Sequence, residues 1–121
     1  MKTILFIEDE SMLQKTFKDF LSQEKYNIIS ALDGEIGIQL AKEKKPDLIL
    51  LDLILPHIDG FQALKTLKED EDTKNIPVIV LTNLEGAGDV EKALALGATT
   101  YLVKANYSLG EVLEKVQKTI G

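Results

Sequence analysis

The 121-residue chain contains no cysteine and no arginine. The absence of cysteine excludes disulfides, thiolate metal sites and thiol catalysis. All 14 basic residues are lysines, and 20 acidic residues give a net charge of −6. Nucleic-acid binding needs a basic face for the phosphate backbone. We therefore expect no direct nucleic-acid partner.

Long apolar runs are also absent. No stretch approaches the length needed to span a membrane, so no membrane partner is expected. The start of the chain, MKTILFIEDE, has only four consecutive apolar residues before its acids, too few for a secretion signal. These features predict a cytoplasmic protein. With 45% hydrophobic and 28% charged residues, residues 1–121 are expected to form one domain around a single core.

Short apolar runs alternate along the chain with stretches of helical period. The apolar runs cover residues 4–7, 26–32, 47–52, 77–82 and 100–104. The third and fourth runs are continuously apolar, which is typical of parallel strands covered on both faces. Two sequences with capping-box spacing, Ser11 to Gln14 and Ser108 to Glu111, predict the starts of the first and last helices. Five strands alternating with five helices predict an α/β domain with a parallel sheet.

Polar residues stand at the carboxyl ends of four of the five expected strands. The carboxyl ends of parallel strands share one edge of the sheet, where ligands bind. Three clustered carboxylates would repel one another, and a single lysine offsets only one charge. Oxygen ligands of this kind suit Mg²⁺, and such a site would attract a phosphoryl group. An acid at one strand end alone is usually a turn or cap residue, so the prediction depends on all of them together. These residues are Glu8, Asp9, Asp52, Thr82 and Lys104.

The sequence resembles the receiver domain of two-component response regulators. The spacing D-x-x-x-P-x-x-D-G from Asp52 to Gly60, the late Thr82, and the run G-A-x-x-Y-x-x-K from Gly97 to Lys104 carry the resemblance. It extends over essentially the whole chain, from Lys2 to about Ile120. A flavodoxin-like (βα)5 fold is implied, with strand order 2-1-3-4-5 and helices on both faces of the sheet.

The resemblance also implies a role for each residue of the edge. Asp52 would accept a phosphoryl group from a histidine kinase or phosphotransfer protein, as a regulatory acceptor and not as an enzyme. Lys104 would pair with the phosphoryl oxygens, Thr82 would move to hydrogen-bond them, and Tyr101 would turn inward behind Thr82. The Mg²⁺ ligands would be Glu8 through a water, Asp9, Asp52 and the backbone carbonyl of Ile54.

The output surface implied by the family is formed by the fourth helix, fifth strand and fifth helix, roughly residues 89–119. Phosphorylation would shift this surface and so control a downstream protein partner that remains unknown. The glycines in residues 84–88 would allow the fourth helix to move. A monomer or weak dimer is expected.

The sequence departs from the family pattern at a few positions. Ala105 follows Lys104 where receivers commonly have proline, and a cis bond before a non-proline residue is costly, so we predict a trans bond. By the resemblance, Ile54 and Leu84 would occupy the positions that govern how water reaches the phosphoryl group. Both are apolar, which predicts slow loss of phosphate. His57 is expected to be a solvated loop residue.

The same residues bear on three alternative functions. A haloacid-dehalogenase-type phosphatase would need an aspartate two residues after its nucleophile, where this chain has Ile54. A flavodoxin-like binder would place its flavin phosphate on the loop after the first strand, where Glu8, Asp9 and Glu10 would repel it. A receiver that is no longer phosphorylated and acts as an interaction module remains as the alternative.

Overall fold

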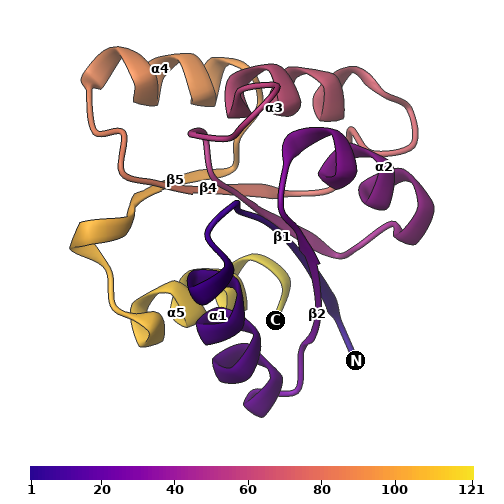
Figure 1. The fold of residues 1–121 in the computed structure, drawn as a ribbon, viewed down its shortest axis with the longest axis vertical. Helices are drawn as coiled ribbons and strands as arrows, with labels where there is room; N and C mark the ends of the chain where they lie inside the picture. The colour runs from indigo at the N-terminus through magenta and orange to yellow at the C-terminus, as the bar shows by residue number, and fades with distance from the viewer.

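Strands and helices alternate along the chain in the computed structural model, which describes residues 1–121 (Figure 1). The five strands are parallel and form one sheet in the order β2-β1-β3-β4-β5. This confirms the predicted fold class. The elements are β1 (Thr3–Ile7), α1 (Ser11–Gln23), β2 (Asn27–Ala31), α2 (Gly34–Lys44), β3 (Leu48–Leu51), α3 (Gly60–Glu69), β4 (Val78–Thr82), α4 (Ala87–Ala95), β5 (Thr100–Val103), the short 3₁₀ helix η1 (Lys104–Asn106) and α5 (Leu109–Ile120).

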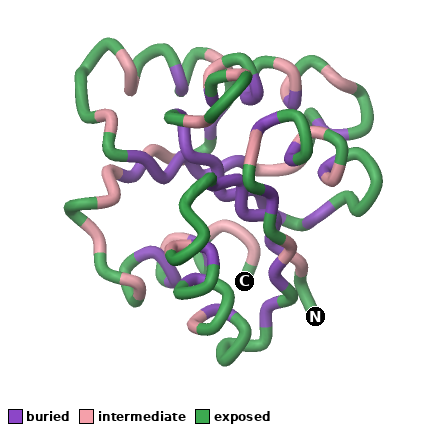
Figure 2. The backbone as a smooth tube through the Cα atoms, in the orientation of Figure 1, coloured by how far each residue is buried: buried purple, intermediate pink, exposed green.

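Helices cover both faces of the sheet. In Figure 1, α2, α3 and α4 form the layer above the strands, and α1 and α5 form the layer below. Alternate residues of each strand enter one of two apolar clusters: Ile4 and Phe6 pack with α1 and α5, whereas Leu5 and Ile7 pack with the other three helices. The central strands are buried along their whole length (Figure 2). Burial on both faces explains why β3 and β4 are continuously apolar in the sequence.

Side-chain caps define the starts of three helices. The carboxylates of Asp33 and Asp59 accept hydrogen bonds from backbone N–H groups in the first turns of α2 and α3. Ser108 and Glu111 form both hydrogen bonds of the predicted capping box at α5. Gly97, with φ of 108°, follows the end of α4, a position that favours glycine. The capping box at α5 therefore forms as the sequence indicated, whereas the cap that Asp33 provides for α2 was not predicted.

The capping box predicted at Ser11 and Gln14 is wrong. Ser11 is the first helical residue, Glu10 is the N-cap residue, and no side chain caps α1. The Gln14 side chain is instead buried and donates to backbone carbonyls at the ends of β1 and β2. Buried carbonyl groups need a donor more than the solvated start of α1 does, so the tertiary contact prevails. No helix in the fold has the length and hydrophobicity required to cross a membrane.

Gly60, the first residue of α3, lies against the backbone of the loop that follows β3. A Cβ atom there would lie 2.2 Å from Leu53 Cα and 2.5 Å from the Asp52 carbonyl oxygen. Neither backbone atom can move without displacing the loop. We expect Gly60→Ala to lower the free energy of unfolding by about 3 kcal/mol, measured by urea denaturation. Gly88→Ala is the matched control, because a Cβ there has no neighbour within 4 Å; it should be neutral or stabilising by about 0.5 kcal/mol. Equal effects of the two changes would contradict this account.

Candidate functional site

Three carboxylates from two separate segments meet at the carboxyl edge of the sheet. One oxygen from each of Glu8, Asp9 and Asp52 lies within 4.8 Å of the others. Backbone hydrogen bonds hold both segments: Glu8 N donates to Ala31 O at 3.0 Å, and Asp52 N donates to Ile7 O at 3.0 Å. Both segments therefore continue directly from their strands. The predicted convergence of these three acids is present in the structure.

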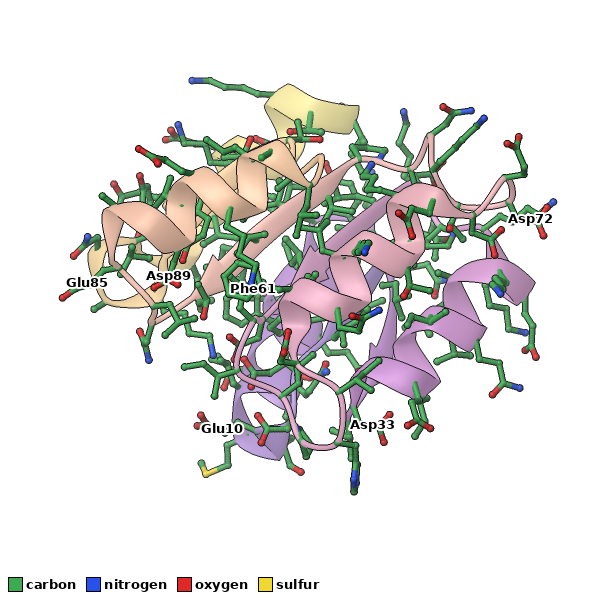
Figure 3. The ribbon with its side chains drawn as sticks, turned by 90° about the horizontal axis from the view of Figure 1, so that it is seen from above. Glu10, Asp33, Phe61, Asp72, Glu85 and Asp89 are labelled. Carbon is green, nitrogen blue, oxygen red and sulfur yellow. The ribbon has the colours of Figure 1, made fainter.

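Further acids surround this edge. Figure 3 looks down onto the layer of α2, α3 and α4, and shows Glu10 and Asp33 at one edge and Glu85 and Asp89 at the start of α4. Asp72, in the turn before β4, lies at the opposite end of the view. Four of the five labelled acids thus follow the carboxyl ends of strands. They add to the negative potential that a cation or a cationic partner would meet on approach.

Lys104 is the one cation within the cluster. Its Nζ donates to Asp52 Oδ2 at 2.9 Å and also to Glu8 Oε1. The second Asp52 oxygen, Oδ1, accepts from the backbone N–H of Ile54 at 3.1 Å. Three carboxylates facing one ammonium leave an excess of negative charge at the site. The lysine therefore neutralises part of the cluster and leaves room for a cation.

Burial makes the negative charge of this cluster costly to maintain. Only 1% of Glu8 and 3% of Asp52 is exposed. Burial, with a smaller contribution from the charge of Asp52, raises the pKa of Glu8 to about 7, although the hydrogen bond from Lys104 opposes the shift. Burial by itself would lower the pKa of Lys104, but its hydrogen bonds to Glu8 and Asp52 outweigh that effect and raise the pKa. Lys104 is thus a fixed positive charge, and Glu8 is the acid that most needs a counter-charge.

Thr82 and Tyr101 meet at the loop after β4. Thr82 is fully buried at the end of β4, and its Oγ1 accepts a weak hydrogen bond of 3.4 Å from Leu84 N. The Tyr101 hydroxyl donates to the carbonyl of the same residue, Leu84, at 2.7 Å. Both residues with predicted switch roles therefore contact one short segment that leads into α4. The movements predicted for them stay predictions.

Ile54, Ala105 and His57 lie in the segments that follow β3 and β5, at the carboxyl edge of the sheet. Ile54 is 53% exposed beside the acids, and its N–H already contacts Asp52. The chain has no cis peptide bond, so the trans bond predicted between Lys104 and Ala105 is confirmed. His57 is an exposed loop residue with φ of 68°, as expected.

Sequence reasoning missed the structural position of Gln14. It is 5% exposed and lies in the buried stripe of α1 with Phe17 and Leu21. The spacing could have indicated this position, because Gln14 stands at i, i+3 and i+7 with the apolar Phe17 and Leu21 and so on the core face of the helix. An amide on that face needs buried hydrogen-bond partners.

The arrangement fits a hard divalent cation. The donors are carboxylate oxygens, which suit Mg²⁺, and the excess of negative charge provides an electrostatic reason to bind one. Asp9 is exposed and its side chain forms no hydrogen bond, so its oxygens are free to coordinate. Lys104 pairs with Asp52 within the same cluster. An anionic group that binds the cation could therefore also pair with the Lys104 ammonium.

A doubly wound α/β domain with this cluster of acids and lysine at its carboxyl edge has the architecture of a signalling receiver. The model of the response regulator receiver domain matches residues 4–117, and the chain belongs to that family. It is therefore a regulatory domain of two-component signalling and not an enzyme of the ordinary kind.

Known relatives agree in length as well as in sequence. The chain is 32% identical over 120 residues to the polar-differentiation response regulator DivK of Brucella anthropi, covering 99% of this chain and 97% of that protein. It is 33% identical, with the same coverage, to DivK of Brucella ovis.

Two solved structures illustrate the same fold. The receiver domain of the sensor histidine kinase PA1611 from Pseudomonas aeruginosa is 30% identical, with a TM-score of 0.89 over 99% of this chain and 98% of that one; it has a magnesium ion coordinated in its active-site cleft. The chemotaxis protein CheY4 of Vibrio cholerae, 24% identical, superposes with a TM-score of 0.91 over 98% of each chain and shows the likeness of fold.

Removing one charge from the cluster should stabilise the metal-free protein. We expect Asp9→Asn to raise the melting temperature in EDTA by about 3 °C, because repulsion among the acids falls. Excess Mg²⁺ should then stabilise the unmodified protein more than the variant. Asp19→Asn, on the exposed surface of α1, is the control and should change neither value. A lower melting temperature for Asp9→Asn in EDTA, or equal responses to Mg²⁺, would contradict the proposed repulsion.

Proposed function

We propose that this protein is a phosphorylation-activated switch that acts in the cytoplasm. Asp52 accepts a phosphoryl group from a histidine kinase or phosphotransfer protein, and the protein then controls a downstream protein partner. The observation that carries this proposal is the setting of Asp52: its carboxylate ends a rigid buried strand, pairs with Lys104, and shares a cluster with Glu8 and Asp9.

The transfer needs little chemistry from the protein beyond positioning and charge neutralisation. An Asp52 carboxylate oxygen forms a bond to phosphorus as the phosphorus–nitrogen bond of a phosphohistidine breaks, and the bonding pair returns to the imidazole nitrogen. Lys104 follows the incoming negative charge, exchanging its contact with Asp52 Oδ2 for a phosphoryl oxygen. Mg²⁺, when bound, supplies Lewis-acid neutralisation of that charge. Asp9, Asp52, the Ile54 carbonyl and, through water, Glu8 would hold it.

The switch begins where the new charge meets the loop after β4. A phosphoryl group adds nearly two negative charges and three acceptor oxygens at Asp52. The Thr82 hydroxyl, now weakly bonded to Leu84 N, would turn toward a phosphoryl oxygen. Because Tyr101 also contacts Leu84, a shift of this segment would reach α4, β5 and α5. A coupling free energy of about 1–3 kcal/mol is sufficient for such a switch.

The acceptor role can be tested by intact mass. With Mg²⁺ and acetyl phosphate, the protein should gain the mass of one phosphoryl group, held as an acyl phosphate that hydroxylamine removes, and Asp52→Asn should gain none. Asp33→Asn is the matched control, because asparagine also caps a helix well and Asp33 lies outside the cluster. No gain in the unmodified protein would favour the alternative of a non-phosphorylated interaction module.

The lifetime of the phosphoryl group should depend on the apolar residues around it. Ile54 is exposed and Leu84 half-buried next to the site, and neither can orient an attacking water. We expect Ile54→Asn with Leu84→Glu to speed phosphate loss by about tenfold, a barrier change of about 1.4 kcal/mol. Phosphate release after removal of the donor gives the rate. An unchanged rate in the double variant would reject the role of these two side chains.

A further inference from the structure

Gln14 connects the first helix to the loop that carries two of the acids. Its side-chain amide lies beneath the carboxyl edge of the sheet, and its Nε2 is within hydrogen-bonding distance of three backbone carbonyl oxygens. These are Phe6 O at 2.8 Å, Glu8 O at 3.0 Å and Ala31 O at 3.0 Å. The three carbonyls belong to β1, to the loop after β1 and to β2, so one side chain joins three backbone segments.

The orientation of the amide follows from these contacts. The NH₂ group has two hydrogens for three acceptors, so one hydrogen is shared. The opposite orientation would place Oε1 against three carbonyl oxygens and is repulsive. Consequently Oε1 points away from them, and it has no hydrogen-bond partner. Leaving Oε1 buried without a partner costs free energy. The hydrogen bonds from the NH₂ group to the three carbonyls compensate that cost.

Of the three carbonyls, that of Glu8 depends most on Gln14. No backbone N–H donates to that oxygen, and Gln14 Nε2 is its only donor within the protein. The rest of the loop has few restraints: Glu10 N donates to the Glu8 carboxylate at 3.1 Å, and Asp9 forms no side-chain hydrogen bond. The direction of the Asp9 carboxylate therefore depends on the backbone orientation at Glu8. Ala31 O holds the N–H of Glu8, and Gln14 holds its carbonyl, which leads into Asp9.

We infer that Gln14 is a positioning residue for the cation site, and this inference rests on the proposed function. It acts on the cation through the backbone of Glu8 and Asp9, without contacting the cation itself. Removing the amide should leave the acids in place in the sequence but widen the range of positions that Asp9 samples. Binding of Mg²⁺ then has to order the loop of Glu8 and Asp9 as well. Because this ordering costs free energy, the affinity for Mg²⁺ falls. Outer contacts that orient metal ligands commonly change affinity by 10- to 100-fold.

Calorimetric titration with Mg²⁺ tests the inference on the full chain. Gln14→Met keeps the size of the side chain and removes its donors, and its dissociation constant for Mg²⁺ should rise about tenfold. At saturating Mg²⁺, the rate of phosphorylation by acetyl phosphate should return close to that of the unmodified protein, because the loop is then ordered by the ion. Gln14→Asn, whose amide is one methylene shorter and reaches fewer carbonyls, should give an intermediate constant and serves if the first variant does not fold.

Thr73→Val is the matched control. Thr73 is equally buried, and its hydroxyl donates to Leu67 O at 2.6 Å in the turn before β4, away from the acids. The control should lose stability and keep its affinity for Mg²⁺. Unchanged affinity in both Gln14 variants, or an equal loss in Thr73→Val, would overturn the inference. If the unmodified protein bound Mg²⁺ but took no phosphoryl group, the proposed function would fail while the comparison of affinities still decided the role of Gln14.

Discussion

The rest of the structure depends on one constraint: an excess of negative charge is held at the carboxyl edge of a sheet that is buried from solvent. Two unit charges about 5 Å apart repel by about 1 kcal/mol in water and about 3 kcal/mol near a protein surface. A domain of this size has a total stability of about 5–15 kcal/mol. Three such pairs form among Glu8, Asp9 and Asp52, and the two ion pairs of Lys104 offset part of their repulsion. The fold therefore tolerates the cluster, and the repulsion that remains makes cation binding favourable.

Lys104 makes this cluster responsive. It bridges Glu8 and Asp52, so its charge is shared between an acid with a raised pKa and the proposed acceptor. A shared counter-ion can be redistributed: new negative charge at Asp52 would draw the ammonium away from Glu8, and the acids on the other side of the cluster would then need a cation more strongly. Charge added at one atom thereby changes several contacts. Thr82 and Tyr101, which both touch Leu84, provide a route by which such changes could reach the surface formed by α4, β5 and α5.

The sequence was sufficient to predict the strands and the convergence of the acids, because continuous apolar runs and the geometry of a parallel sheet decide both. Asp52 was identifiable as a charge that ends such a run. The order of the strands required the family resemblance, since periodicity does not say which strands pair. The bridge made by Lys104 and the hydroxyl contact of Tyr101 depend on side-chain positions that no local pattern encodes. At Gln14, a local capping pattern was misleading because buried carbonyls were stronger partners.

The segments that carry Asp52 and Asp9 differ in rigidity, and this difference affects how the site binds a cation. Asp52 follows β3 directly, and two hydrogen bonds fix it: its N–H donates to Ile7 O of the adjacent strand β1, and its carboxylate accepts from Ile54 N. Asp9 lies in an exposed loop with no such bonds. Mg²⁺ requires nearly ideal octahedral geometry. The lower rigidity of the Asp9 loop therefore limits how well Asp9 and Asp52 can coordinate the ion together. Any contact that restrains the loop, even from beneath the sheet edge, therefore influences the affinity of the site without being part of it.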